Sequence, residues 1–355
     1  SQLIGTGGRD LSEKIGGMMM LDAIQMLEAD PQTEIIALVS KPPAPTVAKK
    51  VLERARACRK PVVVCFLGRA EPPADEQGLQ FARGTREAAL KAVLLSGVKQ
   101  QNLDLPPLDP ALIAEIRAQL TPQQKYIRGL FCGGTLCDET MFAVLEKQAE
   151  VYSNIQPDPA YRLSDINHSI KHTFLDFGDD DFTNGKPHPM IDPTTRSLEI
   201  EKLSQQPETG VLLVDIVLGY GACDDPAGAL LEAINTVRSA RGPEQPLTVI
   251  ATVTGTEQDP QPRSQQIDAL LNGDVIVMNT LQEAVLLAHY LVAPRQHPAP
   301  VALPALLNGV QVINVGLRSF ARDLQQAGCP VVHFQWAPIA GGNPHLAALL
   351  KQLNF

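Results

Sequence analysis

Several signals of common functional classes are missing from this sequence. No apolar run approaches the roughly 20 residues that a transmembrane helix needs, and no secretory signal precedes the first apolar segment. Lysine and arginine are dispersed along a chain of net charge −9, so no basic face for nucleic acid is visible. We therefore expect a cytoplasmic protein that binds neither a membrane nor nucleic acid.

Paired-cysteine and glycine-loop motifs are also missing. The six cysteines form no CxxC pair, and Cys132 and Cys137 stand five positions apart, which argues against a zinc or redox site. Without an export signal, these thiols are expected to stay reduced. Neither the GxGxxG pattern nor the GK[ST] end of a Walker loop occurs, so no standard dinucleotide or P-loop site is predicted.

Aromatic residues are scarce, at 5% of the chain, whereas hydrophobic residues make up 44%. The cores should therefore be aliphatic, as in parallel sheets buried beneath helices. A length of 355 residues leaves room for two or three such domains.

Strand-like apolar runs alternate with amphipathic helical segments along the chain. In residues 1–101 the letters LIGT end a first strand, and the later elements are strands 34–40 and 61–67 and helices 18–30, 44–57 and 85–97. Residues 102–124 carry paired prolines and one short helix, which is typical of a linker.

A second α/β series fills residues 125–293. Its strands are predicted at 126–132, 172–177, 210–218, 246–255 and 274–278, and its helices at 135–148, 193–205, 226–240, 261–272 and 279–292. A proline-rich segment, 294–305, opens a short C-terminal α/β piece that spans 294–355 and ends in a predicted helix, 343–353. The alternating order predicts an α/β fold with two parallel-sheet domains and this extension.

Ligands of such sheets bind where strands end and helices begin. In CGGTLC, Gly133, Gly134 and Thr135 present N–H groups to an anion, or else form a tight turn that Thr135 caps. In LGYGACDDP, Gly219 and Gly221 bring the backbone close to a ligand, while the following aspartates are expected to cap a helix.

The stretch FLDFGDDDFTNGKPHPMIDP, residues 174–193, is unusually rich in carboxylates. Asp179, Asp180 and Asp181 could bind Mg²⁺, which prefers oxygen ligands and bridges carboxylates to phosphate. They could instead pair with Lys186 and Arg196, cap a helix, or remain solvated. These alternatives stay open at this point.

The sequence resembles the succinyl-CoA synthetase superfamily in long motifs. GTGGRDLSEKIGGMMMLDAIQMLEADPQTEIIALVSKPP is similar to the second domain of the α-subunit. FCGGTLCDETM, FLDFGDDD and GVLLVDIVLGYGACDDPAGALLEAI are similar, in order and spacing, to the C-terminal domain of the β-subunit. This fusion, together with PHPMIDPT, TVTGTEQDPQ and INVGLRSFA, resembles the FdrA-type predicted acyl-CoA synthetases over nearly the whole chain.

The resemblance implies two flavodoxin-like ligase domains whose helix N-termini face a shared phosphoryl site. The matching helices would begin at Gly84 and Thr85, and at Gly221 and Ala222. In this family a CoA-binding domain precedes the ligase domain, and we expect it to lie outside this chain. CoA and ATP are the cofactors that the resemblance implies, with Mg²⁺ as a further candidate, and partner subunits or a homodimer are implied as well.

Two departures from the family pattern bear on mechanism. The loop that carries a phosphorylatable histidine in succinyl-CoA synthetases corresponds here to residues 67–84, which contain no histidine. Lys41 stands where the family has a glutamate, and it either neutralises an anion or is a solvated loop lysine. His188 could act as general acid and base, as a phosphate carrier, or as a hydrogen-bonded structural group.

These features lead to three hypotheses. The first is an acyl-CoA synthetase-like, NDP-forming acid-thiol ligase that holds a carboxylate or acyl phosphate between two helix N-termini, with His188, Lys186 and Asp180 as catalytic groups. The second, implied by the resemblance, is a subunit of an oxamate or oxalurate carbamoyltransferase that uses carbamoyl phosphate. The third is a catalytically silent protein that binds CoA or a nucleotide.

Overall fold

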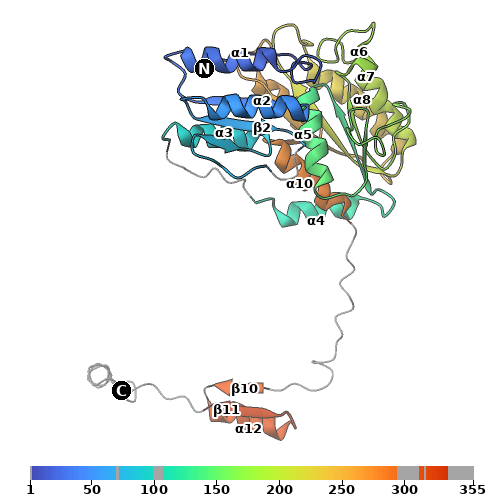
Figure 1. Cartoon of the computed structure of the whole chain (residues 1–355). Coiled ribbons are helices and arrows are strands. Elements are labelled where there is room, and N and C mark those ends of the chain that lie inside the picture. The colour runs from blue at the N-terminus through green and yellow to red at the C-terminus, as the bar shows by residue number, and fades with distance from the viewer. Residues whose placement is uncertain (1, 69–71, 99–106, 294–311, 316, 335–355) are drawn as a thin grey trace, which may run out of the picture. The chain divides into compact units, whose positions relative to one another are not determined.

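A computed structural model describes residues 2–68, 72–98, 107–293, 312–315 and 317–334 (Figure 1). The chain divides into two units, residues 1–293 and 294–355. The architecture is α/β, with parallel sheets of three and six strands in the first unit and a two-stranded pair in the second.

The first sheet is short and parallel, in the order β1-β2-β3. Its strands are β1 (Ile36–Ser40), β2 (Val62–Phe66) and β3 (Leu79–Phe81), and its helices are α1 (Met18–Ala29), α2 (Pro45–Arg56) and α3 (Thr85–Leu95). Val62 and Val64 face the core with α1 and α2, whereas Val63 and Cys65 face the core with α3. Strand β2 is therefore apolar throughout, because helices cover both of its faces (Figure 1).

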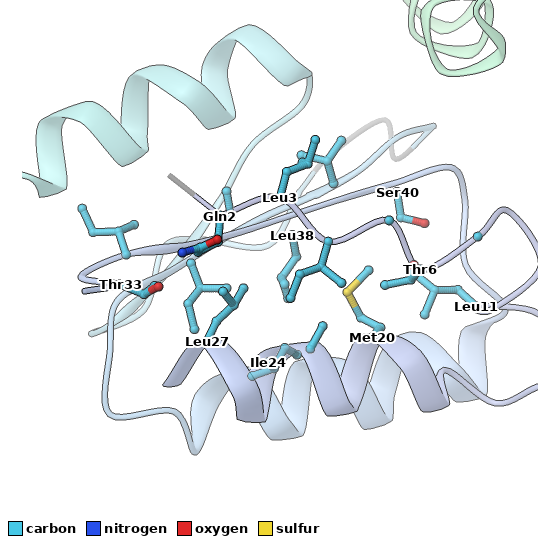
Figure 2. Close-up of a pocket in the computed structure, with 18 of the residues that line it drawn as sticks. Gln2, Leu3, Thr6, Leu11, Met20, Ile24, Leu27, Thr33, Leu38 and Ser40 are labelled. Atoms are coloured by element: carbon cyan, nitrogen blue, oxygen red, sulfur yellow. The ribbon is translucent and has the colours of Figure 1, made fainter. Parts of the chain in front are cut away.

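The predicted first strand, LIGT, does not form. Residues 2–7 contain no strand pairing, and Leu3 is 98% exposed. This segment instead lines a pocket beside α1 and β1 (Figure 2). An apolar run forms a strand only when a neighbouring strand accepts its hydrogen bonds, and in this structure β1 does not accept them.

The second sheet has six parallel strands in the order β5-β6-β4-β7-β8-β9. They are β4 (Tyr126–Phe131), β5 (Val151–Ser153), β6 (His172–Asp176), β7 (Thr209–Val217), β8 (Thr248–Thr254) and β9 (Ile276–Met278). The chain turns to one side of β4 to form β5 and β6, then crosses to the other side to form β7. Ligands of open α/β sheets bind at such a reversal, outside the carboxyl ends of the two strands.

Helices cover both faces of this sheet (Figure 1). One core packs against α7 (Thr194–Glu201), η1 (Lys202–Gln205), α8 (Pro226–Arg241) and α9 (Arg263–Asn272). The other packs against α4 (Pro110–Gln119), α5 (Gly134–Leu145) and α10 (Leu281–Val292). A one-turn helix, α6 (Asp180–Thr183), follows β6. None of the helices in the described ranges is long and apolar enough to cross a membrane.

Helix α5 of the second sheet packs against the first sheet. Phe142 of α5 joins the small core of Val63, Cys65 and Leu67. Gly68, just after β2, has a φ of +77°, and a Cβ built on it would lie 2.6 Å from the Phe142 ring. The two sheets therefore share one core region within residues 1–293, and α5 carries residues to both.

The described part of the second unit, residues 312–315 and 317–334, contains a parallel strand pair and one helix. These elements are β10 (Val312–Val315), α12 (Arg318–Gln326) and β11 (Val331–Phe334). The predicted helix 343–353 and the proline-rich segment 294–305 lie outside the described residues.

Candidate functional site

Lys41 brings together the carboxyl ends of three strands. It follows β1, and its Nζ atom lies 3.0 Å from Asp138 Oδ2 in α5 and 3.3 Å from Asp176 Oδ2 at the end of β6. The two carboxylate side chains are 5% and 3% exposed, whereas the lysine side chain is 39% exposed. Lys41 is therefore the solvent-facing member of a cluster that links the two sheets.

The electrostatics of this cluster favour a bound proton. Burial raises the pKa of Asp138 to about 6, although the nearby ammonium of Lys41 opposes the shift. Burial likewise raises the pKa of Asp176. Burial lowers the pKa of Lys41, but the two carboxylates raise it by more, so the lysine stays charged. With one cation facing two carboxylates, Asp138 is suited to exchange a proton near neutral pH.

Asp138 also has an unused acceptor. Its Oδ2 atom is buried and has no hydrogen-bond partner among the described residues. The contact with Lys41 Nζ is thus an ion pair without hydrogen-bond geometry. This oxygen is buried beneath Lys41, so it becomes available to a substrate group when the lysine moves aside, as an acceptor or, when Asp138 is protonated, as a donor.

The start of α5 adjoins Lys41. A Cβ built on Gly134 would lie 2.9 Å from Lys41 Nζ and 2.5 Å from Asp176 Oδ2, so any larger residue at this position would displace the ends of these two side chains. Gly134 and Thr135 begin the helix, where backbone N–H groups have no partner within the helix. The hydrogen bonds found within the described residues include none from these two N–H groups. Together with the ammonium, they form a candidate anion site.

The N–H group of Gly133, a predicted anion contact, already donates to a carboxylate of the chain. Asp215, in the middle of β7, is fully buried and accepts hydrogen bonds from the N–H groups of Cys132 (2.8 Å) and Gly133 (2.7 Å). Arg196 Nη1 lies 3.0 Å from the same carboxylate. This internal pair holds the loop between β4 and α5, and the sequence analysis did not identify it. An aspartate within the apolar run VLLVDIVL was the signal that could have revealed it.

Backbone N–H groups in the loop before α8 also donate hydrogen bonds to acceptors within the chain. Gly219 donates its N–H to Gln261 Oε1 (3.1 Å), and Ala222 donates to the carbonyl of Gly219 (3.2 Å). Gly221 is exposed and has a φ of +80°. As expected, Asp225 caps the helix through its side chain. The N–H groups of Gly219 and Ala222 thus already have acceptors within the chain, so this structure does not present them to a phosphate.

A carboxylate likewise occupies the start of α3. Thr85 donates its N–H (2.9 Å) and its hydroxyl (2.7 Å) to Glu139 of α5. Gly84 precedes this helix, as predicted, and is buried. The predicted anion contacts at Gly84 and Thr85 thus lie beside a carboxylate of the chain itself.

Of the three predicted catalytic groups, His188 alone approaches the Lys41 cluster. A Cβ built on Gly178 would lie 2.7 Å from His188 Nε2, and Asp176 Oδ1 accepts the N–H of Gly178 (2.8 Å). Lys186 is exposed. Asp180 is exposed and pairs with Arg9 at 2.8 Å. The predicted grouping of His188, Lys186 and Asp180 is therefore not formed.

The acidic run also does not form the predicted metal site. Asp179 accepts the N–H of Asp181 (3.2 Å) and caps α6, while Asp180 faces Arg9. Across the parts of the chain that the structure describes, no group of three His, Cys, Asp or Glu side chains is arranged to hold a metal ion. Consecutive residues of one helical turn point in different directions, so their carboxylates do not converge.

A pocket of about 750 Å³ leads to the cluster (Figure 2). Met20, Ile24 and Leu27 of α1 and Leu38 of β1 form its apolar wall, and residues 2–8 lie across it. Lys41 and Thr135 also line it. The pocket thus joins an apolar wall to the candidate anion site.

Two protein-family models match this sequence. The CoA-ligase model matches residues 130–291, which include most of the second sheet. The CoA binding domain model matches residues 1–68. The second match is at variance with the expectation that the CoA-binding domain lies outside this chain.

One curated relative is similar to most of this chain. The uncharacterized protein YahF of Escherichia coli (strain K12) is 67% identical over 289 residues, which are 81% of this chain and 56% of YahF. The chain thus spans little more than half the length of that relative.

Solved structures also resemble the chain. The apo form of a dinucleotide forming acetyl-coenzyme A synthetase 1 from Ca. Korarchaeum cryptofilum is 15% identical over 76% of this chain and 55% of that chain, with a TM-score of 0.33. An ATP citrate lyase mutant of Methanosaeta concilii in complex with (3S)-citryl-CoA is 11% identical over 79% and 37% of the two chains, with a TM-score of 0.30. The two family models together account for residues 1–68 and 130–291, so this chain combines a region similar to a CoA binding domain with a region similar to a CoA-ligase.

Proposed function

We propose that this chain is the ligase part of an acid-thiol ligase-like enzyme of the NDP-forming type. The observation that carries the proposal is the Lys41 cluster at the start of α5, whose two carboxylates lie in the region that matches the CoA-ligase model and whose lysine lies in the region that matches the CoA binding domain. It combines a cation, two backbone N–H groups for which the described residues supply no acceptor, and a carboxyl group, Asp138, whose pKa burial raises to about 6. These are the groups that an acyl phosphate needs for binding and for proton transfer.

In this proposal the anionic end of the substrate binds Lys41 and the N–H groups of Gly134 and Thr135. A thiol attacks the carbonyl carbon of the acyl phosphate, its sulfur-carbon bond forms, and the carbon-oxygen bond to phosphate breaks. Asp138 takes the thiol proton, with His188 as the nearest second candidate. CoA is the thiol that the family match suggests, and ATP, with its accompanying Mg²⁺, is the expected phosphoryl donor. Partner subunits or a homodimer are part of this proposal as well.

One observation favours a second candidate, a carbamoyltransferase subunit of the oxamate or oxalurate type. The loop 67–84 contains no histidine to carry a phosphoryl group. In this reaction phosphate attacks the carbamoyl carbon of a ureido acid, so that carbamoyl phosphate forms and the amide leaves. That chemistry uses the same anion site and proton exchange, and it needs no phosphohistidine.

The test uses the full-length natural protein with its partners. ATP- and CoA-dependent formation of a thioester from a panel of carboxylic acids supports the ligase. Phosphate-dependent cleavage of oxalurate to carbamoyl phosphate supports the transferase instead. Binding of CoA or nucleotide without either turnover indicates a silent binding protein. A Lys41→Met variant that keeps wild-type turnover in the active assay would remove the proposed site from either mechanism.

A further inference from the structure

The carboxylate of Glu139 is held by donors from two other helices. Its Oε1 atom accepts the N–H of Thr85 in α3 (2.9 Å) and the side-chain amide of Gln282 in α10 (2.9 Å). Its Oε2 atom accepts the Thr85 hydroxyl at 2.7 Å. Glu139 belongs to α5, so one side chain joins α5 to the first turns of α3 and α10.

The position is buried and shaped around a carboxylate. Glu139 is 5% exposed. A Cβ built on Gly84 would lie 2.4 Å from Glu139 Oε1. The φ of Gly84 is −148°, which every residue type adopts, so glycine is needed here for space and not for backbone conformation. Gly84 therefore allows the oxygen to approach the backbone at the start of α3, as glycines do in anion-binding loops.

We propose that Glu139 is a built-in anion that occupies the oxyanion site at the start of α3 and thereby closes it to phosphate. The donors around its carboxylate are of the kind that a phosphoryl group would use, and the start of an eleven-residue helix favours negative charge. A phosphate cannot share this place, because two like charges about 4 Å apart repel by about 4 kcal/mol near a protein surface.

This assignment reaches beyond the proposed function. It means that no phosphoryl group is carried on α3 in this chain, whichever acyl reaction takes place. The site at Lys41 is then where phosphate binds, and this last point rests on the proposed function. The α3 assignment itself does not, because it is tested by binding and stability and not by turnover.

The site also has a route to solvent. A pocket of about 520 Å³ lies beside Glu139, between α3, α5 and α10, and includes Gly84, Arg83, Phe142 and Gln282 in its lining. An ion could therefore reach the start of α3 once the glutamate side chain is shortened.

The experiment is Glu139→Ala in the full-length protein, combined with Lys41→Met so that the other anion site is removed. Thermal unfolding is followed against inorganic phosphate at constant ionic strength. We expect phosphate to raise the Tm of this double variant by a few degrees in a saturable manner. Lys41→Met alone, with Glu139 in place, should show no such rise. Glu146→Ala combined with Lys41→Met is the matched control, because Glu146 lies in the same pocket and is exposed.

If phosphate raised the Tm of Lys41→Met and of the double variant equally, the proposal would be overturned. It would also be overturned if the Tm of the double variant did not change with phosphate. If Glu139→Ala does not fold unaided, its refolding yield is compared with and without phosphate. A yield raised by phosphate for Glu139→Ala, and unchanged for Glu146→Ala, supports the proposal. A yield unaffected by phosphate contradicts it.

Discussion

Lys41 Nζ lies 3.0 Å from Asp138 Oδ2, and this ion pair joins two parallel sheets through one helix. Lys41 follows the first strand of the three-stranded sheet, and Asp138 lies in α5, which follows the first strand of the six-stranded sheet. The next residue, Glu139, is turned by about 100° around the helix axis and contacts α3. Helix α5 therefore places Asp138 at the candidate anion site beside Lys41. It places Glu139 at the start of α3, where the glutamate itself occupies the hydrogen-bond donors.

Replacing Lys41 by methionine should destabilise the protein and remove phosphate binding. The change leaves Asp138 and Asp176 buried without their cation, and we expect the free energy of unfolding at pH 7 to fall by about 1 to 3 kcal/mol. The loss is below that of a fully buried pair because the lysine side chain is 39% exposed. Urea unfolding and a phosphate titration measure both effects. Lys186→Met, which removes an exposed lysine, is the control, and an equal loss there would contradict the assignment.

Asp138 should make the protein less stable as the pH rises. Its pKa of about 6 in the folded state exceeds the ordinary value of 3.8, so between these values the folded chain binds the proton more tightly. The stabilisation is present at about pH 4 and is lost as the pH rises through about 6. Relative to Asp138→Asn, the free energy of unfolding of the wild type should fall by up to about 3 kcal/mol from pH 4 to 7. Parallel curves for the two proteins would refute this.

His172 should make the protein less stable as the pH falls, which is the opposite of the effect of Asp138. Burial, and then the charge of Arg128, lowers its pKa from 6.5 to about 4, and its Nδ1 atom accepts the N–H of Ile127 at 3.1 Å. The unfolded chain therefore binds the proton more tightly, and stability is lost as the pH falls from about 6.5 to 4. His172→Asn keeps an acceptor and removes the titration, so its loss over this range should be smaller by up to about 3 kcal/mol. Urea unfolding at several pH values measures this loss in both proteins. An equal loss in the wild type and in His172→Asn would contradict the assignment of a neutral His172 in the folded state.

Gly68 should be required for the contact between the sheets. Gly68→Ala places a Cβ 2.6 Å from the Phe142 ring at a φ of +77°, so both overpacking and backbone strain oppose it. We expect a loss of about 2 to 4 kcal/mol in the free energy of unfolding. Gly78→Ala has nearly the same φ, +79°, but no atom within 4 Å, so it should lose only about 1 to 2 kcal/mol. Equal losses in the two variants would show that the Phe142 contact is unimportant.

The fold was largely predictable because its signals are local. The buried runs at 61–67 and 210–218 appear as strands β2 and β7, shifted by only a residue at each end. The strands β3 and β5 were missed because each has only three residues, LQF and VYS, in which polar residues interrupt the apolar pattern, whereas the equally short β9 lies within the apolar run VIVM. The predicted strand LIGT failed for another reason, since a strand also depends on a partner, and sequence pattern does not supply one.

The candidate site was only partly predictable. Glycines and a lysine after strands marked Gly134 and Lys41, because the positions of loops follow from the strands. Asp138 and Glu139 gave no signal of their role, since carboxylates in a helix ordinarily face solvent. Lys186 and Asp180 were named for chemistry, yet they are exposed in the structure.

The sequence by itself determined the order of strands and helices and the corners at which ligands can bind, because periodicity, caps and glycines act over a few residues. Only the tertiary structure decided which charged groups meet there. Lys41 and Asp176 are 135 positions apart and come into contact through the packing of two sheets on α5. The same packing places Glu139 against α3, where Thr85 and Gln282 donate hydrogen bonds to its buried carboxylate.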